Sequence, residues 1–238
     1  MSSRPPHANP HLVWDWNSTL FHDMDAIIAA TNASFAVLGL PPLTLERYRE
    51  LYCVPVPRFY EKITGRVPEQ AEWELLDAAF QRAYGAHSAL CELASGADEL
   101  LDAWQRDGNT QSLLSLTAHD ELMPFVERFG IASRFLRVDG RVGPPGGGKA
   151  EHLVRHLDAL RVDPARVVVI GDAADDAVAA RHVGARAVLY TGGSHARASL
   201  EGVGAPVVDS LADAVALARE LRIRRPLRTR FVRPPGNR

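Results

Sequence analysis

Residues 12–20 read LVWDWNSTL, a short apolar run that ends in an aspartate and is followed by small and hydroxyl-bearing residues. The run predicts a brief buried strand with Asp15 at its carboxyl end. An acidic residue that closes a strand is ordinary turn chemistry, so Asp15 becomes informative only if reactive groups also end later strands. Downstream, a lysine and a second acidic cluster do follow strand-like segments.

The composition is that of an ordinary globular protein. The 238 residues are 46% hydrophobic and 24% charged, enough apolar material for one large domain or for a core with a modest insertion. No apolar run approaches the ~18 residues of a membrane span, and residues 1–11 lack the apolar centre of a secretory signal. Cys53 and Cys91 match no metal-ligand spacing. We therefore expect a cytoplasmic protein, with no membrane contact and a flexible N-terminus over residues 1–11.

Basic charge gathers at the C-terminus, where residues 219–238 contain eight arginines and a single acid. Such a tail can contact nucleic acid, but neither a recognition motif nor an aromatic series accompanies it. Pro226, Pro234 and Pro235 favour an irregular, solvated terminus. We therefore expect residues 222–238 to be a disordered basic tail and do not expect nucleic-acid binding.

After residue 20 the pattern becomes helical for about seventy residues. Four helices are expected, at 25–38, 44–52, 59–63 and 68–89. Pro55 and Pro57 are expected to separate the second helix from the third. Because this region lacks strand signals, residues 21–95 are expected to form a helical insertion after the first strand.

From residue 96 onward, strands and helices alternate. Strands are expected at 111–116, 135–138, 167–170, 187–190 and 206–208. Helices are expected between and after them, at 97–106, 119–129, 149–160, 172–183 and 210–222. This alternation predicts an α/β fold, a Rossmann-like parallel sheet with helices on both faces, built from residues 12–20 and 96–221. In such sheets ligands bind beyond the carboxyl ends of the strands.

The groups expected at those strand ends form a chemically coherent set. Lysine is scarce, since only Lys62 and Lys149 occur among 27 basic residues, so a lysine is expected where a compact ammonium is needed. A phosphomonoester brings about two negative charges, which a metal ion and a lysine must offset before a carboxylate can approach phosphorus. The set suits that task. It comprises Asp15, Ser115 or Thr117, Lys149, and the acidic cluster Asp172, Asp175 and Asp176.

This set resembles the four motifs of the haloacid dehalogenase superfamily, in its phosphatase branch with a helical cap after the first strand. The family's first motif, Asp-x-Asp-Gly-Thr, is matched by DWNST at 15–19, and its fourth, Gly-Asp-x-x-x-Asp, by GDAADD at 171–176. The second motif, an apolar strand that ends in Ser or Thr, is matched at Ser115. The third, a lysine that opens a helix, is matched at Lys149. The resemblance covers about residues 12–215.

The resemblance implies a role for each matched position. Asp15 would attack phosphorus and form an aspartyl-phosphate. Ser115 and Lys149 would bind the transferring phosphoryl oxygens, and Thr19 and His119 would also contact substrate. The closest likeness is to phosphoglycolate phosphatase-like proteins, so the resemblance implies a small phosphorylated metabolite as substrate and a monomer or homodimer as the assembly.

A Mg2+ ion is also implied. Its ligands would be the Asp15 carboxylate, the Asn17 backbone carbonyl, Asp172 and Asp176, with waters completing an octahedron. A helix N-cap would explain Asp172 alone. Three aspartates within five residues exceed what a cap requires, so the metal interpretation is preferred.

Two positions depart from the family pattern. Asn17 stands where the family has the general acid, and loss of that proton carrier typically costs about 10² to 10⁴ in rate. Three explanations are open: a slow phosphatase, a substrate with a good leaving group, or another proton carrier such as His22 or His119. Ser18 replaces the usual glycine, which is expected to alter the path of the loop into the cap.

Three alternatives remain open. Phosphonoacetaldehyde hydrolases have a similar first motif and lack the second acid, and Lys62 would then form their Schiff base with substrate. Dehalogenases of the family also lack that acid but need no metal, which would leave Asp172 and Asp176 unexplained. The third alternative is a protein that binds phosphate or a partner without turnover.

Overall fold

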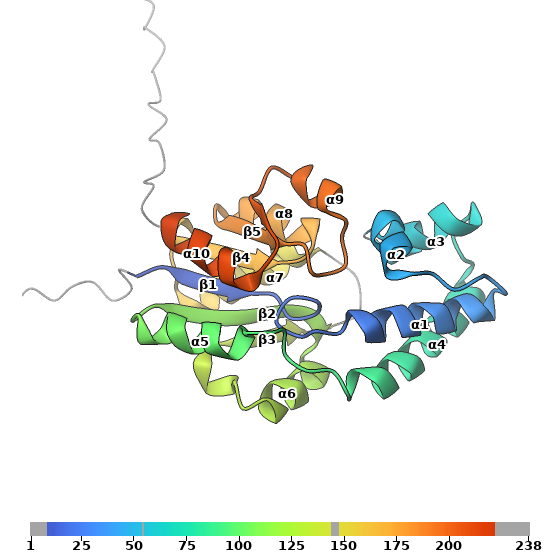
Figure 1. Ribbon diagram of the computed structural model, residues 1–238, viewed down its shortest axis with the longest axis horizontal. Helices are drawn as coiled ribbons and strands as arrows, with labels where there is room; N and C mark the ends of the chain where they lie inside the picture. Colours follow the sequence, from blue (N-terminus) through green and yellow to red (C-terminus); the bar gives the residue numbers. More distant parts are fainter. Residues whose placement is uncertain (1–8, 54, 144–147, 222–238) are drawn as a thin grey trace, which may run out of the picture.

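The computed structural model describes residues 9–53, 55–143 and 148–221 (Figure 1). Most of the expected N-terminal segment and all of the expected basic tail at 222–238 lie outside these residues. Six parallel strands form one sheet in the order β3-β2-β1-β4-β5-β6, which confirms the α/β prediction. The strands are β1 His11–Trp14, β2 Thr110–Ala118, β3 Val138–Arg141, β4 Val167–Gly171, β5 Arg186–Tyr190 and β6 Val207–Val208.

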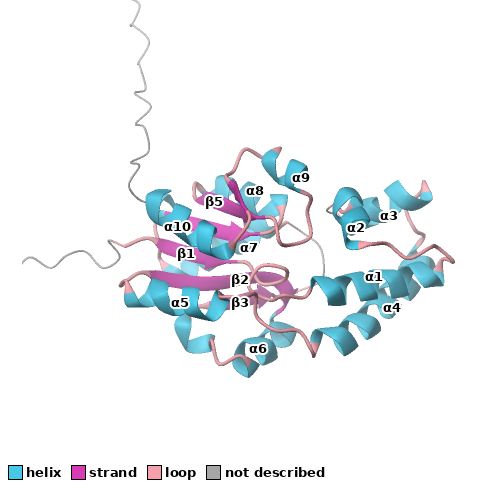
Figure 2. Cartoon of the chain, in the orientation of Figure 1, coloured by secondary structure: helices cyan, strands magenta, loops and turns pink. Residues whose placement is uncertain are grey.

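Helices cover both faces of this sheet (Figure 2). Successive side chains of a strand point to opposite faces: Leu12 and Trp14 pack with α5, α6 and α10, whereas Val13 packs with α7 and α8. The same alternation in the central strand β4 sends Val168 and Ile170 to the first face. The helices of this core are α5 Ala97–Arg106, α6 His119–Arg128, α7 Lys149–Leu160, α8 Ala174–Val183, α9 Arg197–Glu201 and α10 Leu211–Leu221.

Between β1 and β2 the chain forms a helical cap, which lies beyond one end of the sheet (Figure 1). Its helices are α1 Met24–Val37, α2 Leu45–Leu51, α3 Val56–Thr64 and α4 Gln70–Ser88. The cap has its own apolar core, in which the rings of Phe35, Phe59 and Tyr60 pack within about 6 Å of one another. It is therefore a second packed unit built on the first.

The two segments that join the cap to the sheet pair with each other. Phe21 and Leu93 form an antiparallel bridge. Backbone hydrogen bonds flank it, from Ala94 N to Leu20 O at 2.8 Å and from His22 N to Glu92 O at 2.9 Å. The outgoing and returning chains are thus fastened together immediately after the first motif.

Two element predictions need correction. The helix expected at 59–63 begins at Val56, because Pro57 sits in its first turn, where a proline costs no helical hydrogen bond. The strand expected at 135–138 is displaced along the chain. Pairing with β2 begins at Leu136, whose N–H donates to Gln111 O at 2.9 Å, and β3 itself runs from Val138 to Arg141.

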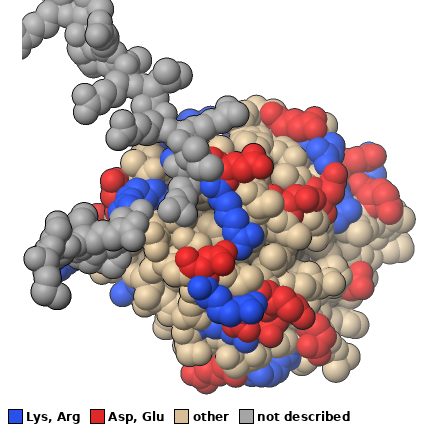
Figure 3. Space-filling model, turned by 60° about the vertical axis from the view of Figure 1, so that its left-hand side comes forward, with Lys and Arg blue, Asp and Glu red and all other residues tan. Residues whose placement is uncertain are grey.

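The surface shown in Figure 3 carries Lys and Arg interspersed with Asp and Glu, rather than a field of one sign. Within the part of the chain that the structure describes, no helix combines the length and apolar character needed to cross a membrane.

Candidate active site

The carboxyl ends of β1, β2 and β4 meet at one edge of the sheet, the edge that faces the cap (Figure 1). The register aligns Trp14 of β1 with Leu113 of β2 and with Ile170 of β4. Residues one or two positions further along each strand therefore lie at the same edge. These residues are Asp15, Ser115 and Asp172.

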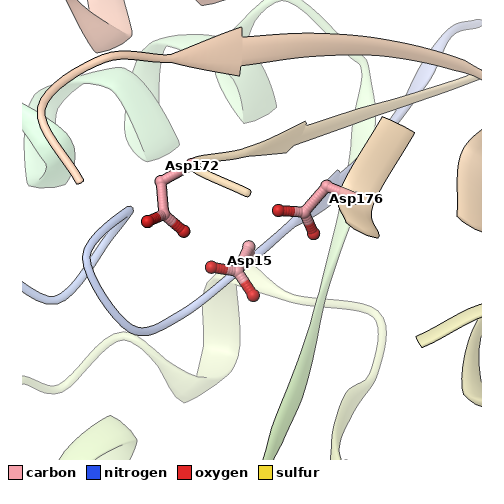
Figure 4. A group of neighbouring side chains, drawn as sticks. All are labelled: Asp15, Asp172 and Asp176. Atoms are coloured by element: carbon pink, nitrogen blue, oxygen red, sulfur yellow. The ribbon is translucent and has the colours of Figure 1, made fainter. Parts of the chain in front are cut away.

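Three carboxylates meet at this edge. Asp15, Asp172 and Asp176 each offer an oxygen, and these oxygens lie within 4.8 Å of one another (Figure 4). Lys149, the first residue of α7, lies beside them: its Nζ donates to Asp15 Oδ1 and, at 2.5 Å, to Asp176 Oδ1. The lysine is only 5% exposed. The structure thus brings together the aspartate, the lysine and the acidic pair that the sequence singled out.

The segment GDAADD owes its shape to its own carboxylates. Asp176 Oδ2 accepts a hydrogen bond from Ala173 N at 3.0 Å and so caps the helix that contains it. A Cβ on Gly171 would lie 2.1 Å from the same oxygen, so only glycine fits there. Asp175 has a separate task, because its Oδ2 accepts from Lys149 N at 3.0 Å and caps the start of α7.

Asp172 is held by the loop that follows β5. Its Oδ2 accepts hydrogen bonds from the backbone N and from the Oγ of Ser194, both at 2.6 Å. A Cβ on Gly193 would lie 2.2 Å from this carboxylate, so only glycine fits at that position of the loop. No positive side chain is among the hydrogen-bond partners that the structure gives this acid.

The electrostatic balance of the cluster suits a divalent cation. Burial raises the pKa of the Asp15 carboxyl to about 6, although the Lys149 ammonium acts in the opposite direction, and burial raises that of Asp172 to about 7. Burial lowers the pKa of Lys149, but Asp15 and Asp176 outweigh this effect and raise it above its usual value. With all three acids ionised, one ammonium leaves two negative charges uncompensated. Oxygen ligands with that net charge fit Mg2+.

Hydroxyl groups surround the first two motifs. Thr19 Oγ1 donates to Asp15 Oδ2 at 3.0 Å, so this threonine helps to fix the orientation of the Asp15 carboxylate. Ser115 lines the cavity above the sheet, and Thr117 N donates to its Oγ at 3.0 Å. Both hydroxyls donate to Asn17 Oδ1, Thr117 Oγ1 at 2.6 Å and Ser115 Oγ at 3.4 Å. Of the two candidates for the second-motif hydroxyl, Ser115 is the one that lines the cavity.

Asn17 is fixed by partners on both sides of its amide. Its Nδ2 donates to Asp23 Oδ2 and to Tyr84 Oη, each at 2.8 Å. Asp23 is fully buried, and burial raises its pKa. Ser18 adds two further donors to the same carboxylate, from its backbone N at 2.7 Å and from its Oγ at 3.1 Å. Sequence reasoning missed Asp23, although its proximity to Asn17 along the chain offered a signal.

Ser18 adopts φ +57°, the left-handed region in which glycine is most at ease. Ser18 therefore keeps the left-handed backbone conformation that suits the glycine usually found at this position of the motif. Hydrogen bonds to Asp23 offset the strain, because a serine there contributes a hydroxyl that glycine lacks.

Three other candidate residues lie apart from the cavity. His22 is exposed at the start of the outgoing segment. His119 opens α6, and its Nδ1 accepts from Gly140 N at 3.1 Å. Lys62 is exposed on α3, and its Nζ donates to Leu51 O at 3.1 Å. None of the three is among the described residues that line the cavity.

The cavity has a volume of about 180 Å³ and is closed by residues that the sequence did not reveal. Tyr48 comes from α2, Tyr52 directly follows that helix and Ile27 comes from α1, so the cap forms one wall. Ser194 and His195 come from the loop after β5. The available signal for the last two was their place directly after a pair of glycines in the loop that follows a parallel strand.

Arg49 joins the cap to that loop. Its Nε donates to Gly193 O at 2.7 Å and its terminal nitrogen donates to Gly192 O at 2.9 Å. Ala196 N donates in return to Arg49 O at 3.3 Å. Helix α2 is thereby held against the segment that positions Ser194.

The chain is similar to known hydrolases and phosphatases in sequence and in fold. A family model described as HAD-hydrolase-like matches residues 147–214. Phosphoglycolate phosphatase 1 of Pseudomonas aeruginosa is 25% identical over 86% of this chain and 78% of its own length. The N-acetylmuramic acid 6-phosphate phosphatase of the same species is 29% identical over 75% of this chain and 81% of its own.

Solved structures share the fold. A haloacid dehalogenase-like family hydrolase from Streptococcus pneumoniae superposes with a TM-score of 0.74 at 17% identity, covering 88% of this chain and 98% of its own. A hydrolase from Pseudomonas syringae gives a TM-score of 0.74 at 18% identity, covering 89% and 99%. Both similarities extend over the sheet and the cap together.

Proposed function

We propose that this chain, which is similar to haloacid dehalogenase-like hydrolases in sequence and fold, is a Mg2+-dependent phosphatase acting on a small phosphorylated metabolite through Asp15. The observation that carries the proposal is the buried cluster of three carboxylates around one lysine. Its two uncompensated negative charges match a divalent cation, and a cation there lets a phosphoryl group approach Asp15.

The reaction would divide into two displacements at phosphorus. In the first, an Asp15 oxygen bonds to phosphorus while the bond to the leaving alcohol oxygen breaks, and that oxygen takes a proton from solvent water because Asn17 has none to give. In the second, water attacks the aspartyl-phosphate, inorganic phosphate departs and the Asp15 carboxylate is restored. Lys149, already bonded to Asp15, would bind a phosphoryl oxygen and offset its charge. Ser115 would donate to another, and Thr19 would keep Asp15 oriented.

The residues that would hold Mg2+ are Asp15, Asp172, Asp176 and the backbone carbonyl of Asn17. When bound, the ion would supply charge neutralisation for the phosphoryl oxygens. Ser194 would orient Asp172 for this purpose through its two hydrogen bonds.

Asn17 distinguishes this site from one with an acid at that position. Both of its amide hydrogens and its oxygen are already engaged within the protein, and an amide has no titratable proton to donate. The proposed enzyme would therefore be slow with poor leaving groups and faster with activated esters.

Schiff-base chemistry at Lys62 has no comparable support. The ammonium lies on the exposed side of α3 and is hydrogen-bonded to Leu51 O. The free thiols of Cys53 and Cys91 are compatible with the proposed cytoplasmic location.

The direct test measures phosphate release with Mg2+ from p-nitrophenyl phosphate and from a panel of phosphorylated metabolites that includes phosphoglycolate. Wild-type activity should depend on Mg2+, and Asp15→Asn should lower it at least a thousandfold. Wild-type rates no higher than those of Asp15→Asn across the panel would refute the proposal.

A further inference from the structure

The cap contains a second cavity, of about 250 Å³, enclosed by helices α1 to α4. Most of its wall is aromatic or aliphatic. The rings come chiefly from Phe59, Tyr60, Trp73 and Phe80. An apolar cavity of about 150 Å³ suffices to hold benzene, so this one can hold a ring with a short substituent.

This cavity adjoins the active-site cavity. Ile27, Tyr48 and Tyr52 line both. The ring of Tyr52 stands between the two, with its centroid 5.2 Å from that of His195 on the active-site side and 5.7 Å from that of Phe59 on the cap side. The two cavities therefore share one wall, and a group attached to a phosphate at Asp15 would reach the cap cavity when the Tyr48 and Tyr52 side chains move aside.

The charges around the two cavities disfavour an anionic extension. Asp77 is the charged residue among those described that line the cap cavity, and it is an acid exposed at the rim. In the active-site cavity, Lys149 is bonded to two carboxylates, and burial lowers the pKa of His195.

Two further cations belong to the cap but are not among the described residues that line either cavity. The Arg49 guanidinium donates to the carbonyls of Gly192 and Gly193. Lys62 donates to Leu51 O, although its ammonium also helps to lower the pKa of His195 in the active-site wall. Lys149 is thus the one Lys or Arg among the described residues of the two walls, and a carboxylate that enters the cap cavity would lose its hydration without an ionic partner there.

From this arrangement, and resting on the proposed phosphatase function, we infer that the substrate is a phosphomonoester whose leaving group is uncharged and carries an aromatic or bulky apolar portion. The aromatic wall would bind that portion, and the rim acid would exclude carboxylates. The curated relatives named above take their names from phosphoglycolate and N-acetylmuramic acid 6-phosphate, which both carry a carboxylate. The inferred specificity separates this chain from them.

The test compares benzyl phosphate, ethyl phosphate and phosphoglycolate, three esters of primary alcohols, as substrates with Mg2+. We expect kcat/KM for benzyl phosphate to exceed that for phosphoglycolate at least tenfold, with ethyl phosphate between them. If Asp15-dependent hydrolysis occurs but phosphoglycolate is used as well as or better than benzyl phosphate, the inference is wrong while the phosphatase proposal stands.

Binding provides a readout that needs no turnover. Calorimetry with Mg2+ should give a Kd for benzylphosphonate at least tenfold below that for phosphonoacetate. If benzylphosphonate binds more tightly than phosphonoacetate but no ester is hydrolysed, the cavity assignment is supported and the proposed phosphatase activity is refuted. Equal or weaker binding of benzylphosphonate would overturn the inference.

A charge reversal at the rim tests the exclusion of carboxylates. Asp77→Lys should raise kcat/KM for phosphoglycolate relative to benzyl phosphate by about two- to fivefold, since exposed charges act weakly through solvent. Glu74→Lys makes the same change of net charge three residues earlier on α4, outside the cavity wall. A ratio that moves equally in both variants, or in neither, would contradict the role of Asp77.

Discussion

The side-chain amide of Asn17 donates to the buried carboxylate of Asp23 across 2.8 Å. An acid at position 17 would therefore meet a second acid whose other partners, Ser18 and Tyr84, carry no positive charge. The amide at position 17 and the carboxylate at position 23 are a matched pair.

A charge swap tests this pairing. Asn17→Asp alone should lower the free energy of unfolding by about 1–3 kcal/mol, because two carboxylates share one buried contact. The double variant Asn17→Asp/Asp23→Asn restores an amide–carboxylate pair and should recover most of that loss. It should also raise kcat/KM about 10- to 100-fold, because position 17 then carries a titratable proton. Thermal unfolding and steady-state kinetics measure both effects, and a single variant as stable as wild type would contradict the pairing.

The ionised carboxylate of Asp172 should lower the free energy of unfolding when no cation is bound. Burial raises its pKa to about 7, so its ionised form is unfavourable in the metal-free fold. Asp172→Asn should raise the melting temperature in EDTA by several degrees, while Mg2+ should raise it less than in wild type. Asp158→Asn, on the exposed side of α7, is the control for an ordinary surface acid. An equal Mg2+-induced shift in wild type and Asp172→Asn would remove this residue from the metal site.

Arg49 should affect catalysis more than stability. Its two bonds to the Gly192 and Gly193 carbonyls hold the loop that orients Ser194 against Asp172. Arg49→Met should lower kcat/KM about tenfold, with a change in melting temperature below about 3 °C. Arg47→Met is the matched control, since Arg47 forms an exposed pair with Glu50 on the same helix. Equal kinetic effects of both substitutions would show that the loop contact is unimportant.

His156 should make the stability depend on pH. Burial lowers its pKa, although Asp139, 2.7 Å from Nδ1, acts in the opposite direction. The folded protein thus favours the neutral ring, whose contribution is complete above the unfolded pKa of about 6.5 and is lost as pH falls below it. Urea titrations should show the stability advantage of wild type over His156→Gln shrinking between pH 7.5 and 5.5. A constant difference across that range would show that His156 does not titrate differently in the two states.

The main features of the fold and of the carboxylate cluster were predictable because each buried parallel strand appears in the sequence as an apolar run whose end can be recognised. Asp15 and Asp172 each follow an apolar run closely, so neighbouring strands bring them together without knowledge of side-chain packing. Lys149 could be placed because it follows a glycine-rich segment and opens a helix.

The cap wall was not predictable in the same way. Tyr52 reaches the active site only because α2 packs against the loop after β5, a contact made by Arg49 from a distant part of the chain. Periodicity identifies such helices but not which of their faces covers the core. The Asn17–Asp23 contact likewise depends on the left-handed turn at Ser18, which a sequence with serine in place of glycine does not suggest.

The bridge between Phe21 and Leu93 ties the two cap connections to each other at the edge of the sheet. The backbone of Phe21 also bridges that of Asn17, so these connections are continuous with the loop that carries Asp15, the proposed nucleophile. Arg49 fastens the cap at a second place, to the loop whose Ser194 bonds Asp172. The cap is thus attached beside two of the three carboxylates, so its position and the geometry of the cluster are mechanically coupled.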